Sequence, residues 1–147
     1  MPLQLATVEY FANLDFNDKI RMSIDQWVLD EVIRLIEDEQ LDIGIDGDGD
    51  IIGVYSVATE MITEGEKKAG DKFNLLDTGE FRNSIKTRVI KDTNGYGIGI
   101  DADPEKEGGD NLFDLYGERI INLTSDNLGW IINQIKINVI RILRERR

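Results

Sequence analysis

The chain has 147 residues, of which 41% are hydrophobic and 31% charged, and it contains only two prolines. This length and balance favour one globular domain, residues 1–147, and exclude a disordered tail or a fibrous repeat. The net charge of −12 argues against direct nucleic-acid binding, because that affinity depends on clustered lysine and arginine.

The charge is unevenly distributed along the chain. Residues 126–147 hold five basic and two acidic residues, a net charge of +3, which leaves −15 for residues 1–125. Arginine near the end of a helix complements the helix dipole, and this is the simpler interpretation. The same split would also let the basic end of one copy meet the acidic body of another copy or an acidic partner.

The sequence contains neither cysteine nor histidine. A disulfide framework, a thiolate nucleophile, the commonest zinc ligands and the usual near-neutral general base are therefore excluded. We predict no catalytic residue and no cofactor. The first residues lack the basic flank and apolar run of a secretory signal, and no segment approaches the roughly 20 apolar residues of a membrane span. We expect a soluble protein made in a cytoplasm, without a membrane partner.

The first predicted element is a long amphipathic helix over residues 16–41. Asn17 can cap this helix, and Asp18 would lie in its first turn. Apolar residues recur at steps of three and four, as expected for the buried face of a helix: Ile24, Val28, Val32, Leu35 and Ile36.

Glycine interrupts the helical pattern in the next segment. Residues 42–56 are predicted to form an extended acidic arm that turns on the sequence IDGDGDIIG. A short helix is expected over residues 56–70, ended by Gly70.

A second short helix is predicted where the sequence reads LLDTGEFRNSI. The side chain of Asp77 or Thr78 can accept a hydrogen bond from the following turn, which favours a helix of one to two turns over residues 79–84. Glu80 and Arg82 are expected to face outward from it.

The clearest β signal is a hairpin over residues 85–101, with a turn at Asp92-Thr93-Asn94-Gly95 between two alternating runs. A polar loop over residues 101–111 follows. Glycine on one face of the second strand would leave room for a large side chain to lie close. That strand places apolar residues and glycines on opposite faces: Tyr96, Ile98 and Ile100 against Gly97 and Gly99.

The chain ends in a predicted long helix, capped by Thr124 or Ser125 and packed on the sheet. Its core stripe comprises Leu128, Ile131, Ile132, Ile135, Val139, Ile142 and Leu143. Further apolar residues lie beside this stripe, and a helix so apolar is either deeply buried or shared between subunits. We favour a subunit interface that includes Trp130, Ile137, Ile140, Arg141 and Arg144.

These elements define an α+β fold class. It combines a long N-terminal helix, a small antiparallel sheet with its hairpin at residues 85–101, and a long C-terminal helix.

The run IDGDGDIIG invites comparison with a calcium loop. Asp46, Asp48 and Asp50 match the first three ligand positions. Ile51, however, stands where the loop needs glycine, and Val57 stands where it needs a closing carboxylate. We therefore predict no standard metal site, only three weak candidate ligands. The favoured interpretation is an exposed acidic turn that positions the arm and could meet the arginines at the end of a neighbouring copy.

Two alternatives to a structural role remain open. The first is a calcium-dependent binding module that uses the Asp-Gly turn. The second, less favoured, is a carboxylate-based enzyme, although nothing selects a catalytic pair among 29 acidic residues. Asp-Thr-Gly at residues 77–79 also occurs around the catalytic aspartate of retroviral-type aspartic proteases, but their downstream glycine motif is missing here.

Several short motifs follow one another in a distinctive order. They are a Gly-Asp turn running into IGVYSVAT, the box TGEFRNSI before a hairpin, and LYG followed by INLTSDNL, within residues 45–60, 75–90 and 113–130. In this order the chain resembles the small neck, tail-completion and minor tail proteins of tailed bacteriophages. It looks closest to uncharacterised members from phages and prophages of gut bacteria.

The resemblance implies a role for individual residues and for the whole protein. Tyr116, Gly117 and Leu123 would fix the entry to the last helix. Proteins of this class assemble as rings in the virion, with no cofactor and no turnover. We therefore expect a homo-oligomer that is made in the host bacterial cytoplasm and contacts other neck or tail proteins. The box that joins sheet to helix would be Thr78, Gly79, Phe81, Arg82, Ser84 and Ile85.

Overall fold

A computed structural model describes the chain over residues 6–11, 17–54, 61–62, 64–65, 69–72, 75, 79–93, 95–105 and 111–145. One strand is followed by a run of helices, then by two consecutive strands and a second run of helices, in agreement with the predicted α+β class. The strands are β1 (Ala6–Phe11), β2 (Lys86–Asp92) and β3 (Gly95–Ala102). The helices are α1 (Asn17–Ser23), α2 (Gln26–Arg34), the π-helix η1 (Leu35–Leu41), α4 (Glu80–Asn83), α5 (Leu112–Tyr116), the 3₁₀ helix η2 (Glu118–Ile121) and α6 (Ser125–Glu145).

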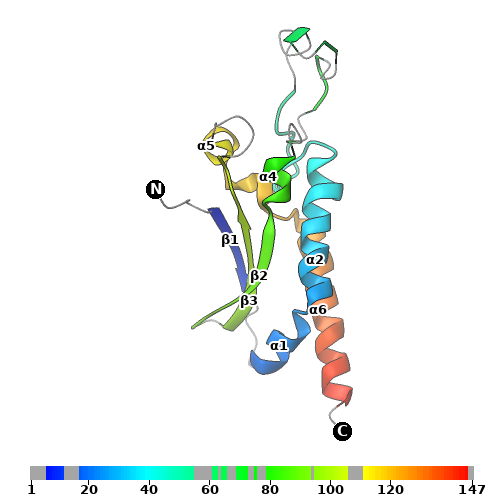
Figure 1. The fold of residues 1–147 in the computed structure, drawn as a ribbon. Helices are drawn as coiled ribbons and strands as arrows, with labels where there is room; N and C mark the ends of the chain where they lie inside the picture. Colours follow the sequence, from blue (N-terminus) through cyan, green and yellow to red (C-terminus); the bar gives the residue numbers. More distant parts are fainter. Residues whose placement is uncertain are drawn as a thin grey trace.

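The three strands form one antiparallel sheet in the order β1-β3-β2 (Figure 1). The β2–β3 hairpin confirms the prediction, with a register that runs from Lys86 opposite Asp101 to Asp92 opposite Gly95. Strand β1 was not predicted. Its sequence ATVEYF alternates in the manner of a strand, but it is short and pairs with β3 far along the chain.

The predicted single helix over residues 16–41 is wrong, because the chain forms three consecutive helical pieces. The break lies at Asp25, which is extended and caps α2 by accepting a hydrogen bond from the Val28 amide at 3.0 Å. Beyond Arg34 the hydrogen bonding changes to the π pattern, as in the bond from the Asp42 amide to the Glu37 carbonyl at 2.9 Å. The predicted apolar positions are nevertheless all buried: Ile24, Val28, Val32, Leu35 and Ile36.

The hydrophobic core lies between one face of the sheet and the helices (Figure 1). Ile98 and Ile100 point into this core from the central strand. On the opposite face of β3, the side chains of Arg88 and Ile90 lie over Gly99, at 3.3 Å and 3.0 Å from where a Cβ would stand. The predicted division of β3 into an apolar face and a glycine face is therefore confirmed.

The last helix was expected to pack on the sheet, but α6 packs chiefly against α1 and α2. Asn138 occupies a buried position on its inner side and donates a hydrogen bond from Nδ2 to the carbonyl of Ser23 at 2.9 Å. Of the predicted core stripe, Ile131 and Ile142 are buried, whereas Ile132 and Leu143 are exposed.

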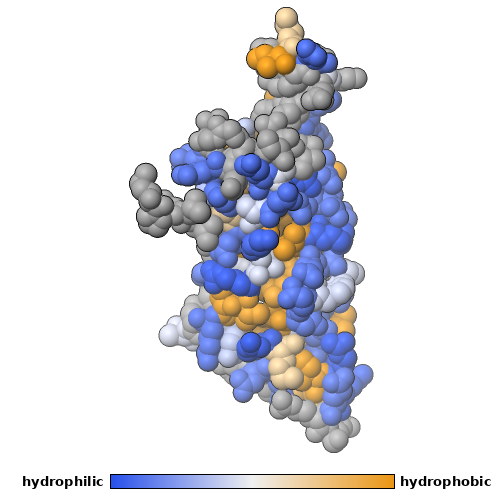
Figure 2. All heavy atoms as spheres, viewed as in Figure 1, coloured by the Kyte–Doolittle hydropathy of each residue, from blue (hydrophilic) through white to orange (hydrophobic). Residues whose placement is uncertain are grey.

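The described part of residues 52–72 extends past the sheet and helices at the end of the molecule where α4 lies (Figure 1 and Figure 2). A bridge between Val54 and Lys72 joins its two sides. Of the predicted helix over residues 56–70, only Met61 and Ile62 are described as helical, and most of the segment lies outside the described residues. Among the described residues, no helix is long and apolar enough to cross a membrane.

Strand β1 is tied to the start of α6 by one side chain. The Leu123 amide donates a hydrogen bond to the Tyr10 hydroxyl at 2.9 Å, and burial raises the pKa of this phenol above its ordinary value. The strand that sequence patterns missed therefore contributes directly to the position of the last helix.

We expect Tyr10→Phe to lower the free energy of unfolding by about 1 kcal/mol, because the buried Leu123 amide loses its acceptor. Urea denaturation measures this change. Tyr96→Phe is the matched control, since the Tyr96 hydroxyl makes no hydrogen bond to a described residue. Equal losses in both variants would contradict the role assigned to Tyr10.

Candidate functional site

The Asp46 carboxylate is the buried centre of the acidic turn. Only 1% of the residue is exposed. Its Oδ1 accepts hydrogen bonds from the amides of Asp48 and Asp50, at 2.9 and 3.1 Å, and its Oδ2 lies 3.2 Å from the guanidinium of Arg119. The predicted exposed acidic turn is therefore wrong for Asp46, although Asp48 and Asp50 are exposed.

Within the extended arm predicted over residues 42–56, residues 45–51 instead close on themselves as a compact turn. The Asp46 amide donates to the Asp50 carbonyl at 2.9 Å, and the Gly49 amide donates to the Asp46 carbonyl at 3.0 Å. Ile45 and Ile51 then pair as an isolated antiparallel bridge. The Asp-Gly repeat favours this compact shape, because carboxylates accept hydrogen bonds from nearby amides and Gly49 adopts a positive φ of 82°.

The turn is docked on the segment that leads into α6. The Gly47 amide donates to the Arg119 carbonyl at 2.7 Å. A Cβ on Gly47 would collide with the Cβ of Asn122 and would stand 2.8 Å from its carbonyl carbon and oxygen. Only glycine allows the two backbones to approach this closely.

A buried glutamine fixes the start of α6 from the other side. The Gln40 side chain donates to the Asn122 carbonyl at 2.7 Å and accepts from the Thr124 amide and the Asn127 side chain, each at 3.0 Å. Thr124 is the helix cap, as predicted, because its hydroxyl accepts from the Asn127 amide at 3.2 Å. All of the polar atoms of the Gln40 side chain are therefore used within the fold.

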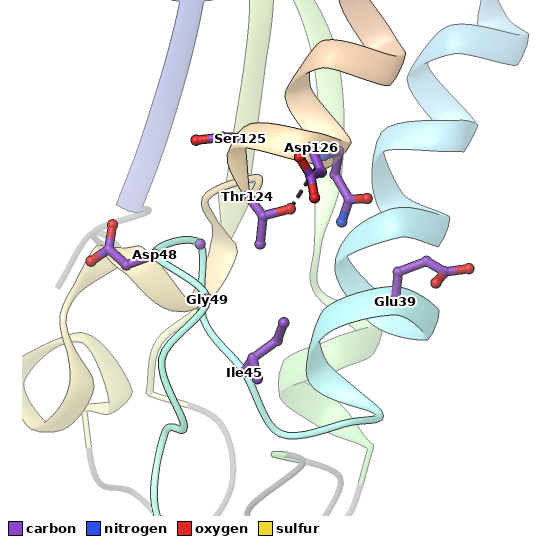
Figure 3. Close-up of a pocket in the computed structure, with 9 residues that line it drawn as sticks. Glu39, Ile45, Asp48, Gly49, Thr124, Ser125 and Asp126 are labelled. Atoms are coloured by element: carbon purple, nitrogen blue, oxygen red, sulfur yellow. Dashed lines mark hydrogen bonds between the residues drawn. The ribbon is translucent and has the colours of Figure 1, made fainter.

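An open pocket of about 560 Å³ lies where the turn, η1 and α6 meet (Figure 3). In Figure 3 the carboxylates of Glu39 and Asp48 point in opposite directions, away from the space between them. The lining residues are Glu39, Ile45, Gly47, Asp48, Gly49, Thr124, Ser125, Asp126 and Asn127. The pocket is acidic, but its charged groups do not converge on one point.

One carboxylate oxygen from each of Asp46, Asp48 and Asp50 lies within 4.8 Å of the others. These are the three weak cation ligands considered from the sequence. The Asp46 carboxylate already contacts two amides and a guanidinium, so it is the least available of the three to bind a cation. The Asp46 contacts favour an internal structural role over metal coordination.

The box TGEFRNSI forms the joint between α4 and β2. Phe81 is buried and packs edge to face on Phe113, with ring centroids 6.2 Å apart. Ser84 donates to the Phe81 carbonyl at 2.6 Å and accepts from the Asp103 amide at 2.9 Å. Ile85 is also buried. The predicted short helix is confirmed, whereas Thr78 and the alternative cap Asp77 lie outside the described residues.

Arg82 was expected to face outward, but it is only 5% exposed. Its guanidinium lies 2.7 Å from the Asp42 carboxylate and 3.3 Å from that of Glu37, and it donates to the Glu37 carbonyl at 3.1 Å. The carboxylates of Glu37 and Asp42 and the Glu37 carbonyl, all at the C-terminal end of η1, attract the guanidinium, which explains the inward orientation. The residue before α4, Gly79, adopts a positive φ of 81°.

The residues expected to fix the entry to α6 lie in or beside α5 and η2. Gly117 ends α5 with a positive φ of 82°. Leu123 is buried, and its amide makes the bond to Tyr10 described above. Tyr116 packs against the core. Neither short helix was predicted from the sequence.

The predicted interface residues lie along the outer side of α6. Trp130, Ile137 and Ile140 are 46%, 48% and 49% exposed. Arg141 and Arg144 are also exposed. Their exposure is compatible with a subunit contact, which stays a prediction.

Comparison of the chain with protein-family models, with curated proteins and with solved structures finds no match.

Sequence patterns missed the residues that hold the site together: Tyr10, Gln40, Arg119 and Asn138. Two of these carried a detectable signal. Gln40 and Asn138 stand at positions where the helical period expects an apolar residue, Asn138 being seven residues after Ile131. A polar residue at such a position predicts a buried hydrogen bond, although not its partner.

We expect Gly47→Ala to lower the free energy of unfolding by about 2 to 3 kcal/mol, since its Cβ would collide with the Asn122 backbone. Gly49→Ala is the matched control in the same turn. A Cβ there meets no atom within 4 Å, so only the positive φ opposes it, at a cost of about 1 kcal/mol. Urea denaturation compares the two. A loss for Gly49→Ala as large as that for Gly47→Ala would contradict the docking of the turn.

Proposed function

We propose that this protein is a non-enzymatic structural component of a tailed-phage virion, a head-tail connector, neck or tail-completion protein that assembles as a ring. The observation that carries this proposal is the series of exposed apolar side chains along α6. Several large apolar side chains exposed on one helix are typical of an interaction surface. The exposed members are Trp130, Ile132, Ile137, Ile140 and Leu143.

The positions of these side chains around the helix support a ring. Trp130 and Ile137 are seven residues apart and lie on one flank of α6, while Ile132 and Leu143 lie on the other flank. The buried residues of the helix, such as Ile131, lie between the two flanks. A ring requires each subunit to contact two neighbours through two different surfaces, and the flank that carries Trp130 and Ile137 can provide one of them.

The phage assignment rests on the order of the short motifs. The contacts of the TGEFRNSI box lie within the fold, where Phe81, Arg82 and Ser84 are engaged in packing and internal hydrogen bonds. We therefore assign the box a structural role at the joint between α4 and β2. The proposed partners are further copies of the chain and other neck or tail proteins, after synthesis in the host bacterial cytoplasm. The proposal includes no cofactor, no membrane and no direct nucleic-acid contact.

The most direct test is the size of the purified protein. Mass photometry and negative-stain electron microscopy should show a concentration-dependent ring. Genes for portal, capsid or tail proteins beside the coding sequence would support the virion assignment, whereas metabolic neighbours would oppose it.

We expect Ile137→Asp to shift the assembly toward monomers, because a charge would be desolvated at the centre of the contact. The dissociation constant should rise by about 100-fold or more, measured by sedimentation velocity. The melting temperature should stay close to that of the wild type, since this side chain is half exposed. Leu115→Asp, at an exposed position of α5, is the control and should assemble normally. Assembly of Ile137→Asp at the wild-type concentration would refute the α6 contact.

The second candidate function is a calcium-dependent binding module, which is favoured by the proximity of three carboxylate oxygens in the turn. A carboxylate enzyme has no comparable observation in its favour among the described residues. Because Asp46 is engaged with Arg119 and no closing bidentate ligand is present in the described turn, we expect calcium to bind weakly.

We expect isothermal titration with calcium chloride to give a dissociation constant above about 1 mM. Asp48→Ala should leave this weak heat signal almost unchanged. Tight binding of one ion per chain, abolished in Asp48→Ala, would instead establish the binding-module alternative.

A further inference from the structure

The second half of α6 presents basic and apolar side chains on the same side of the helix. At 3.6 residues per turn, Ile137, Ile140, Arg141 and Arg144 fall within an arc of about 100°. All are exposed. The Arg141 guanidinium donates to the Asn138 side chain at 3.3 Å, and neither arginine forms an ion pair with a described residue. We call these residues the basic row.

A surface of opposite character lies around the acidic turn, at the other end of α6. Ile43, Ile51 and Val54 are about half exposed. The amide of Ile52 donates to the Gly44 carbonyl at 3.0 Å, which brings the two sides of the turn together. Asp48 and Asp50 are exposed, and their side chains form no ion pair with a described residue. We call Ile43, Asp48, Asp50, Ile51 and Val54 the acidic patch.

The two surfaces cannot meet within one chain. The acidic patch adjoins the first turn of α6, because Asp48 and Ser125 line the same pocket. The basic row lies toward the far end of this 21-residue helix, which is about 30 Å long. A contact between them therefore requires two molecules.

We propose that the basic row of one copy docks on the acidic patch of the next copy. This inference rests on the proposed function and names the surface that α6 meets in the ring. Each surface combines apolar side chains with one sign of charge, so apolar burial and electrostatic attraction act together. The two surfaces differ, so the contact is heterologous and closes into a ring when the rotation between copies allows it.

The contacts of the turn explain why this surface is available. Arg119 neutralises the buried Asp46, so the only carboxylate that supports the turn internally is already paired. Asp48 and Asp50 contribute their backbone amides to this support, and both residues are exposed. Their charges can therefore be reversed without removing a contact that the turn needs.

A paired charge reversal in the full-length chain tests this proposal. Arg141→Glu with Arg144→Glu should weaken assembly by about 100-fold, and so should Asp48→Lys with Asp50→Lys, because each places like charges opposite one another. An equimolar mixture of the two double variants should assemble again, since each altered surface then meets a surface of opposite charge. Mass photometry measures all three samples.

Control variants separate this contact from a general effect of charge. Asp30→Lys with Asp114→Lys makes the same change of charge on exposed residues of α2 and α5 and should assemble normally. Circular dichroism should show folded protein for each variant. If a reversal variant unfolds, the neutral pair Asp48→Asn with Asp50→Asn replaces it, with an expected weakening of about tenfold.

The outcomes distinguish this inference from the proposed function. A wild-type protein that stays monomeric at every concentration overturns both. A wild-type ring that tolerates reversal of the acidic patch, or a mixture that fails to assemble, overturns only the head-to-tail contact and leaves the ring. Recovery in the mixture alone supports the pairing of these two surfaces.

Discussion

The burial of one carboxylate, that of Asp46, sets the geometry at the end of the molecule where α6 begins. Two amides of its own turn and the guanidinium of Arg119 satisfy it, so the charge can be buried without a large penalty. The backbone of Gly47 then lies directly against that of Asn122. Because the two backbones touch, no side chains can pack between them. Hydrogen bonds therefore hold the turn against the segment before α6. Gln40 extends this polar joint to the first turn of α6.

Hydrogen bonding of a buried polar group also explains the break in the N-terminal helix. In a continuous helix, the Ser23 carbonyl would accept a hydrogen bond from the amide of Trp27. The break at Asp25 instead leaves this carbonyl to Asn138, which reaches it from a buried position on α6. Asparagine among apolar neighbours would be costly without such a partner. The interrupted helix and the polar residue of α6 therefore depend on each other, although they lie far apart in the sequence.

These dependencies decide which features the sequence could predict. The β2–β3 hairpin, the short helix after Gly79 and the Thr124 cap depend on neighbouring residues, and all three were found from local patterns. The burial of Asp46 and Arg82 was not, because each depends on a partner in another element. A carboxylate in a glycine-rich run is usually solvated, and so is a guanidinium group on a short helix. Only the fold reveals that each has an internal partner.

The polar joints also determine how α6 is presented to other molecules. The helix is held at its start by Gln40 and at its middle by Asn138, and it rests on α1 and α2 along its inner side. Its outer residues are thus carried on an element that is already ordered. Association through them would spend little free energy on ordering the backbone, so most of the gain from burying Ile137 and its neighbours would remain as binding energy. A fold that fixes an apolar helix from within, while leaving its outer flanks uncovered, is suited to assembly.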